Sequence, residues 1–125
     1  MHESAAVLLV EDEDTLRQAI AKLLRKVGFD VFEAGNGTAA IDLLHAHGTE
    51  IDGILLDMTI PGHSSADVLA EAAMIRPALK VLLTSAYAKE MVTEGLASPL
   101  VRGFIRKPFQ LTSLLQQLRG ILANS

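Results

Sequence analysis

The sequence predicts an α/β domain in which a five-stranded parallel sheet is doubly wound, with helices on both faces. Short apolar runs alternate five times with stretches whose apolar residues recur at helical spacing, and this is the order of repeated strand–helix units. Half of the 125 residues are apolar, which is enough to bury one continuous core. We therefore expect a single domain over residues 1–125.

The first strand and helix are expected at the amino-terminal end. Residues 6–10 form a nearly continuous apolar run, as in a strand that is covered on both faces. The acidic residues 11–14 follow, where carboxylates are favourable near a helix start, and an apolar stripe then runs from Leu16 to Val27. Gly28 suits the exit from this helix.

The next two units repeat the pattern. Residues 30–34 read as a strand, Asn36-Gly37 as a turn, and a short helix with an apolar face ends near Gly48. The third strand is expected at residues 51–56 and runs directly into Asp57. A polar loop over 61–65 follows, and its serines are candidate caps for a helix that closes at Arg76-Pro77. The apolar positions of these two helices are Ala40, Ile41, Leu44, Val68, Leu69 and Ala72.

The last two units complete the predicted sheet. Residues 81–84 are expected to form the fourth strand, and residues 103–106 a short fifth strand. A fourth helix is expected to be mobile, because Gly95 and Ser98-Pro99 interrupt it. Its apolar residues are Met91, Val92 and Leu96. The final helix has an apolar face of Leu111, Leu114, Leu115, Leu118, Ile121 and Leu122.

Composition excludes several classes of function. The formal net charge is −4 and the basic residues are scattered, so we expect no nucleic-acid binding by this chain. No apolar run approaches the roughly 20 residues of a membrane helix, and no signal peptide is recognisable, so we expect a cytoplasmic chain without membrane insertion. Cysteine is absent, which excludes disulfides and thiolate metal sites.

Charged and polar residues stand where the predicted strands end, which is the edge at which open parallel sheets bind ligands. They are Glu11 and Asp12, Asp57, Thr84 and Ser85, and Lys107. If strands one, three and five are neighbours, three carboxylates and one ammonium converge there. A divalent cation would offset the repulsion between the carboxylates, and Mg²⁺, with Mn²⁺ as a substitute, prefers such oxygen ligands. A carboxylate left partly free could then attack a phosphoryl group and form an aspartyl phosphate.

Four segments in order resemble the signature of bacterial response-regulator receiver domains. They are Val10-Glu11-Asp12, Leu56-Asp57-Met58, Ser85-Ala86 and Lys107-Pro108-Phe109. The resemblance covers nearly the whole chain and implies a flavodoxin-like fold with strand order 2-1-3-4-5, which the family shares with the flavodoxins.

The resemblance also implies a role for each residue of the signature. Asp57 would be the phosphoacceptor and also a metal ligand, and Lys107 would contact the phosphoryl group. Asp12 would ligate the metal directly, Glu11 would act through a metal-bound water, and the backbone carbonyl of Thr59 would supply a further ligand.

A hydroxyl and an aromatic ring would form the family's conformational switch. Thr84 and Ser85 are adjacent, so a strand directs them to opposite faces and only one can reach the phosphoryl group. Ser85 matches the family pattern better, because it precedes the small residue Ala86. The switch aromatic falls on Phe104, which would move inward when Ser85 is drawn toward the phosphoryl group.

The sequence departs from the family pattern at several positions. Ser65 stands where the loop after the phosphoacceptor more often carries glycine, and Phe104 stands where tyrosine is commoner and lacks its hydroxyl. Met58 and Tyr87 flank the site at positions where the family tunes dephosphorylation.

By this resemblance the chain is expected to be the phosphoacceptor of a two-component phosphorelay. It would take a phosphoryl group from a histidine kinase or a histidine phosphotransfer domain, and it would catalyse its own phosphorylation and dephosphorylation without turning over an external metabolite. Residues 84–87 and 101–105 look similar to receivers of hybrid sensor histidine kinases. An output domain or a second copy of the chain are further expected partners.

Two alternatives of other classes remain open at this point. The first is a receiver-like interaction domain that works without phosphorylation, against which the intact set of Asp12, Asp57 and Lys107 argues. The second is a phosphohydrolase with an aspartyl nucleophile. Such enzymes place a second carboxylate two residues after the nucleophile, where this chain has Thr59.

Overall fold

The computed structural model describes residues 5–60, 62, 64–87 and 98–123. Strands and helices alternate along these ranges as the sequence predicts, except between the last two strands, where residues 88–97 lie outside them. They are β1 (Ala6–Val10), α1 (Asp14–Lys26), β2 (Asp30–Ala34), α2 (Gly37–His47), β3 (Gly53–Asp57), α3 (Ser65–Ile75), β4 (Lys80–Ser85), β5 (Val101–Arg106) and α5 (Leu111–Ala123).

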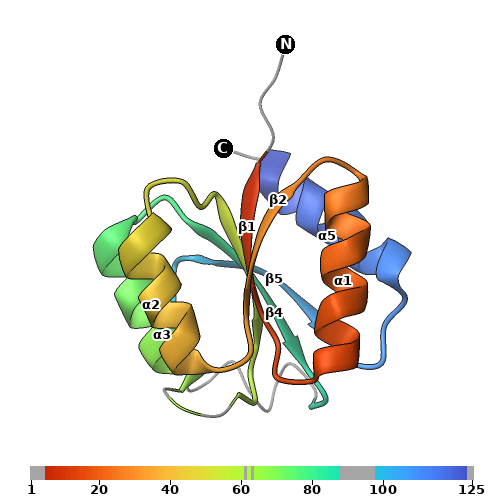
Figure 1. Ribbon diagram of the computed structural model, residues 1–125, viewed down its shortest axis with the longest axis horizontal. Coiled ribbons are helices and arrows are strands. Elements are labelled where there is room, and N and C mark those ends of the chain that lie inside the picture. The colour runs from red at the N-terminus through yellow and green to blue at the C-terminus, as the bar shows by residue number, and fades with distance from the viewer. Residues whose placement is uncertain (1–4, 61, 63, 88–97, 124–125) are drawn as a thin grey trace.

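The five strands form one parallel sheet in the order β2-β1-β3-β4-β5. This confirms the predicted flavodoxin-like order. The sheet is covered on both faces, with α2 and α3 on one side and α1 and α5 on the other (Figure 1).

Alternation along the central strands explains why these strands are apolar without interruption. Ile54 belongs to the core beneath α2 and α3, whereas its neighbour Leu55 belongs to the core beneath α1 and α5. Both side chains are buried, because successive residues of a strand point to opposite faces and both faces are covered. The sheet therefore separates two apolar cores and presents its strand ends at one edge.

Local capping fixes where the helices begin and end. Gly28 follows α1 with a φ of +107°, a conformation that glycine adopts without strain. Ser64 caps α3, and its side chain and that of Asp67 form a reciprocal capping box. The extended conformation of Arg76, before Pro77, ends the same helix. These features confirm the predicted exit at Gly28 and the predicted closure at Arg76-Pro77.

Three predicted local structures differ from the observed ones. Asn36-Gly37 is not a turn, because the Asn36 side chain accepts a hydrogen bond from the Ala39 amide and Gly37 begins α2. Ser65 is not a loop residue but the first residue of α3. The third strand begins at Gly53 rather than residue 51, since the Asp52 side chain accepts a hydrogen bond from the Ala6 amide.

The fourth and fifth strands are longer than predicted. They pair along Lys80–Ser85 and Val101–Arg106 with a register shift between Val81 and Leu82. The predicted fourth helix around Met91, Val92 and Leu96 lies outside the described residues. Among the described helices, none combines the length and the apolar composition that a membrane crossing would need.

Candidate functional site

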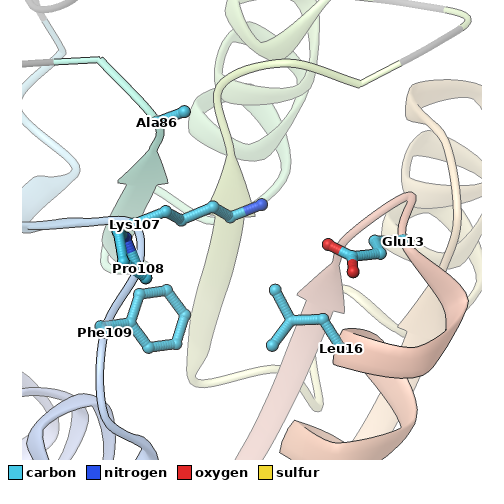
Figure 2. Close-up of a pocket in the computed structure, with 6 residues that line it drawn as sticks. All are labelled: Glu13, Leu16, Ala86, Lys107, Pro108 and Phe109. Carbon is cyan, nitrogen blue, oxygen red and sulfur yellow. The ribbon is translucent and has the colours of Figure 1, made fainter.

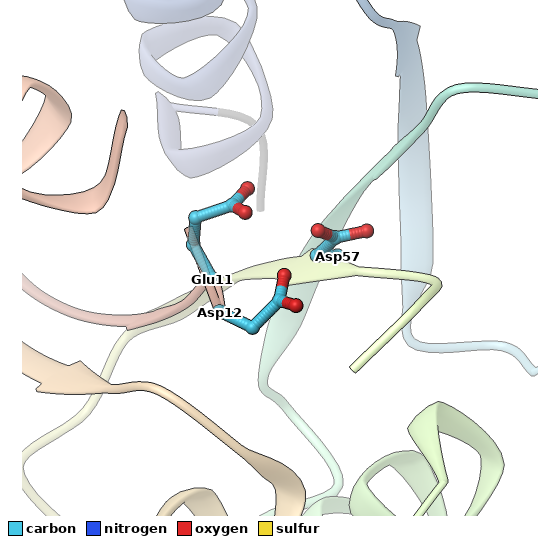
Figure 3. A group of neighbouring side chains, drawn as sticks. All are labelled: Glu11, Asp12 and Asp57. Atoms are coloured by element: carbon cyan, nitrogen blue, oxygen red, sulfur yellow. The ribbon is translucent and has the colours of Figure 1, made fainter. Parts of the chain in front are cut away.

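The site lies where the central strands β1 and β3 end. Glu11 and Asp12 directly follow β1, and Asp57 is the last residue of β3. One carboxylate oxygen from each of the three residues lies within 4.8 Å of the others. Figure 3 shows the three side chains converging from the two strand ends. Three negative charges therefore share one small volume, as the sequence predicts.

Lys107, which follows β5, brings a positive charge to the same place. Its ammonium Nζ lies 2.9 Å from Glu11 Oε1 and 2.9 Å from Asp57 Oδ2. The prediction made this contact depend on strands one, three and five being neighbours, and that condition is wrong, because β4 lies between β3 and β5. The long side chain of lysine spans the distance, so the charges meet without adjacent strands.

The carboxyl groups that Lys107 contacts are shielded from water. Glu11 and Asp57 are only 2% and 4% exposed, whereas Asp12 is exposed. Desolvation raises the pKa of Glu11, and the neighbouring charge of Asp57 adds to this, while the hydrogen bond from Lys107 opposes it. Desolvation lowers the pKa of Lys107, but its contacts with both carboxylates outweigh that effect, so the net shift is upward. Lys107 is therefore held as a cation between two buried carboxyl groups.

Each of the three oxygen atoms of Asp57 accepts a hydrogen bond. The Thr59 amide donates a 3.0 Å hydrogen bond to Oδ1, and Lys107 donates to Oδ2. The Ser65 hydroxyl donates a 2.8 Å hydrogen bond to the main-chain carbonyl. The sequence marks Ser65 as a candidate helix cap and as a departure from the family pattern, and it does not predict this contact.

An open pocket of about 390 Å³ adjoins the charged cluster. Figure 2 shows Glu13 and Leu16, at the start of α1, facing Lys107 and Phe109 across its opening. Ala86 and Pro108 complete the lining. The pocket is thus lined by apolar residues together with the charged residues Glu13 and Lys107.

The model of the response regulator receiver domain matches residues 7–119. The chain belongs to this family. A sensor kinase, CckA of Brucella abortus, is 33% identical over 119 residues, which are 95% of this chain and 13% of that protein. The chain spans 13% to 50% of the length of the first three curated relatives.

Solved structures show the same fold for receiver domains. A response regulator receiver protein from Sinorhizobium medicae matches with a TM-score of 0.86 and 25% identity, over 98% of this chain and 97% of that one. The receiver domain of the hybrid histidine kinase CckA matches with a TM-score of 0.78 and 30% identity, over 94% and 99%. This receiver domain is thus similar to modules of two-component systems, including one from a hybrid kinase.

Ser85 and Phe104, for which the sequence predicts a switch role, lie at the end of β4 and within β5 of this receiver domain. Ser85 is fully buried, and its Oγ accepts a 2.9 Å hydrogen bond from the Tyr87 amide. The Ser85 carbonyl accepts a 2.7 Å hydrogen bond from the Lys107 amide, so β4 supports the residue that carries the ammonium. Phe104 is partly buried against the core beneath α2 and α3.

The donor set of this receiver domain fits a hard divalent cation. Glu11, Asp12 and Asp57 offer only carboxylate oxygens, which Mg²⁺ prefers.

Arg17, which the sequence does not single out, supports the carboxylate group from α1. Its guanidinium donates a 3.0 Å hydrogen bond to the Glu11 carbonyl and pairs with Glu33 of β2. No pattern in the sequence distinguishes Arg17 from the other basic residues of α1.

Proposed function

We propose that this receiver domain accepts a phosphoryl group on Asp57 from a phosphohistidine of a histidine kinase or a histidine phosphotransfer domain. The observation that carries the proposal is the buried Asp57 carboxylate, which Lys107 contacts within a group of three carboxylates. An isolated strand-end aspartate would need neither a buried counter-charge nor two further carboxylates within 4.8 Å.

All three of the site's carboxylates would hold the metal in this reaction, and Asp57 would be both a ligand and the phosphoacceptor. Asp12, the exposed member of the group, would ligate it directly, and Glu11 would act through a bound water. The Thr59 carbonyl would add a further oxygen. Mg²⁺, which Mn²⁺ can replace, would supply positive charge to the phosphoryl oxygens when bound.

The protein's own groups would perform the remaining steps. An oxygen of Asp57 forms a bond to phosphorus while the bond from phosphorus to the donor imidazole nitrogen breaks, and the imidazole takes up a proton. Lys107 neutralises charge on the transferred group, and the Ser85 hydroxyl donates to one of its oxygens. Phe104 then moves inward, which changes the surface for a partner. Attack by water on phosphorus then breaks its bond to the Asp57 oxygen, which releases inorganic phosphate and restores the carboxylate.

The same proposal extends to the location and the partners of the receiver domain. We propose that residues 1–125 act as one receiver unit in the cytoplasm of a bacterium, within a hybrid histidine kinase, a longer regulator or on their own. The domain modifies only itself, so it is no enzyme for an external metabolite. An output domain or a second copy of the chain would read the altered surface.

The test is phosphorylation by acetyl phosphate with Mg²⁺, with and without chelator, followed by intact mass. Wild type is expected to gain the mass of one phosphoryl group only when the metal is present. Asp57→Asn is expected to gain none, whereas Asp42→Asn, which removes an exposed carboxylate from α2, is expected to behave as wild type.

A wild type that gains no mass is then offered beryllofluoride with Mg²⁺, which separates rapid hydrolysis from incapacity. Binding of beryllofluoride would mean that the phosphoryl group is lost too fast to observe. Failure of both reactions would contradict the proposal and leave the alternative of a receiver-like interaction domain that works without phosphorylation.

A further inference from the structure

The hydroxyl of Ser65 contacts the main chain of Asp57 in the interior of the protein. Ser65 is 3% exposed, and its Oγ lies 2.8 Å from the Asp57 carbonyl oxygen to which it donates. Ser65 is the first residue of α3 and Asp57 is the last residue of β3. The hydrogen bond therefore closes the base of the loop that joins this strand to this helix.

Asp57 needs such support because it extends past one of the two neighbouring strands. Pairing between β1 and β3 ends at Val10 and Leu56, one residue before Asp57. Pairing with β4 continues on the other side, where Asp57 lies opposite Thr84. A buried carbonyl without a partner is costly, so a side-chain donor at the end of the β1–β3 ladder stabilises the strand end.

The donor itself is held by the helix rather than by the loop. Ser64 and Asp67 form the capping box that fixes the first turn of α3. Val68 and Leu69 anchor the same turn in the core, with exposures of 0% and 3%. The position of the Ser65 hydroxyl is thus set by packed and capped structure.

Two contacts of Asp57 are made to its reacting carboxylate, and one is made to its main chain. Among the described residues, Thr59 and Lys107 bind its carboxylate oxygens, which are the atoms that would meet metal and phosphorus. Ser65 binds the main-chain carbonyl, which takes no part in the chemistry. Its hydrogen bond can persist while the carboxylate exchanges its partners.

We propose that Ser65 is a positioning residue for phosphoryl transfer in this receiver domain, an inference that rests on the proposed function of Asp57. The hydroxyl holds the Asp57 main chain, and through it the carboxylate and the following Thr59, in the geometry for metal binding and attack. Small misplacements of reacting groups slow reactions strongly, so loss of this hydrogen bond should affect both processes.

The experiment compares Ser65→Ala with Ser64→Ala and Ser65→Thr in the full chain. Ser64→Ala is the matched control, because it removes the neighbouring hydroxyl and weakens the start of α3 without touching Asp57. Ser65→Thr keeps a hydroxyl on the same carbon. Each protein is measured for its urea midpoint, for its Mg²⁺ dissociation constant from the dependence of that midpoint on Mg²⁺, and for its rate of phosphorylation by acetyl phosphate.

Ser65→Ala is expected to lower the phosphorylation rate about tenfold and to weaken Mg²⁺ binding to a similar degree, as losses of supporting groups around metal sites do. Ser64→Ala is expected to lose stability yet keep both values within about twofold of wild type, and Ser65→Thr is expected to recover most of the loss. If Ser65→Ala does not fold, Ser65→Cys, a weaker donor of similar size, replaces it.

Equal rates and equal Mg²⁺ constants for Ser65→Ala and Ser64→Ala would overturn the inference, because the hydroxyl would then serve the helix alone. That result leaves the proposed function intact as long as wild type is phosphorylated. A wild type that accepts no phosphoryl group and no beryllofluoride would instead overturn the proposed function, and the Mg²⁺ constants would still show whether Ser65 positions the carboxylates.

Discussion

Replacement of Asp12 by asparagine is expected to make the metal-free receiver domain more stable. Asp12 adds a third carboxylate within 4.8 Å of Glu11 and Asp57, while Lys107 already pairs with those two. Two unit charges about 4 Å apart interact by about 1 kcal/mol in water, and Asp12 is exposed, so the value for water applies. Removing its charge should therefore raise the free energy of unfolding by about 1 kcal/mol in the presence of chelator.

The same substitution is expected to remove most of the stabilisation by Mg²⁺. A ligand at 100 times its dissociation constant stabilises the folded state by about 2.7 kcal/mol, and wild type should gain this amount. Urea unfolding followed by circular dichroism, in chelator and in saturating Mg²⁺, measures both effects. The control is Glu13→Gln, which removes an exposed carboxylate from the same loop but outside the group of three.

The Glu13→Gln control also accounts for the loss of a favourable interaction with the helix dipole. Both Asp12 and Glu13 lie at the amino-terminal end of α1, where the helix dipole favours negative charge, so both variants lose that small contribution. If Asp12→Asn is no more stable than Glu13→Gln in chelator, the argument from repulsion is wrong. If Mg²⁺ stabilises Asp12→Asn as much as wild type, Asp12 is not a ligand.

Three further predictions concern stability. The raised pKa of Lys107 means that its contribution is complete below its ordinary value of 10.5 and is lost as the pH rises through the folded value, so wild type should lose more stability at alkaline pH than Lys107→Met. Urea midpoints of the two proteins across that range check this, and parallel curves would contradict it. Gly120→Ala in α5 should add about 0.5 to 1 kcal/mol to the free energy of unfolding, because alanine favours the helix and the new Cβ would meet no atom within 4 Å. Gly48→Ala should instead lose about 1 to 3 kcal/mol, since its Cβ would meet the Ile75 side chain and the Leu44 carbonyl. Urea unfolding of both glycine variants is the measurement, and a gain for Gly48→Ala would show that this corner of the fold can relax.

The sequence predicts the sheet well because buried parallel strands leave a strong apolar signal. β1 and β2 have the predicted bounds, and Asp57 ends β3 as expected. Errors arise where a side chain replaces a backbone partner. Asn36 caps α2 with its side chain, which turns a predicted turn into a helix start, and Asp52 binds the Ala6 amide ahead of β3. The Asn36 cap is a local contact at a position that also fits a turn, whereas the Asp52 contact joins residues 46 positions apart and is invisible to local patterns.

The sequence predicts which charged residues form the site, but it does not predict the residues that hold them in place. Carboxylates at strand ends stand out in the sequence, because they follow apolar runs at the edge where open parallel sheets bind ligands. The partners that hold them are ordinary residues in sequence terms. Arg17 is one basic residue among several on α1, and Ser65 is one of two serines in a row. Only the fold shows which of them reaches the site.

Among the residues that the structure describes, one ammonium faces three carboxylates, and this charge ratio predicts the order in which ligands bind. With three charges of −1 and one of +1, the resting group carries a formal charge of −2. An anionic phosphodonor approaching that group is repelled, whereas a divalent cation is attracted and brings the sum to zero. We therefore expect the metal to bind first and the phosphodonor second. Phosphorylation by every donor should then depend on the concentration of free Mg²⁺ in the same way.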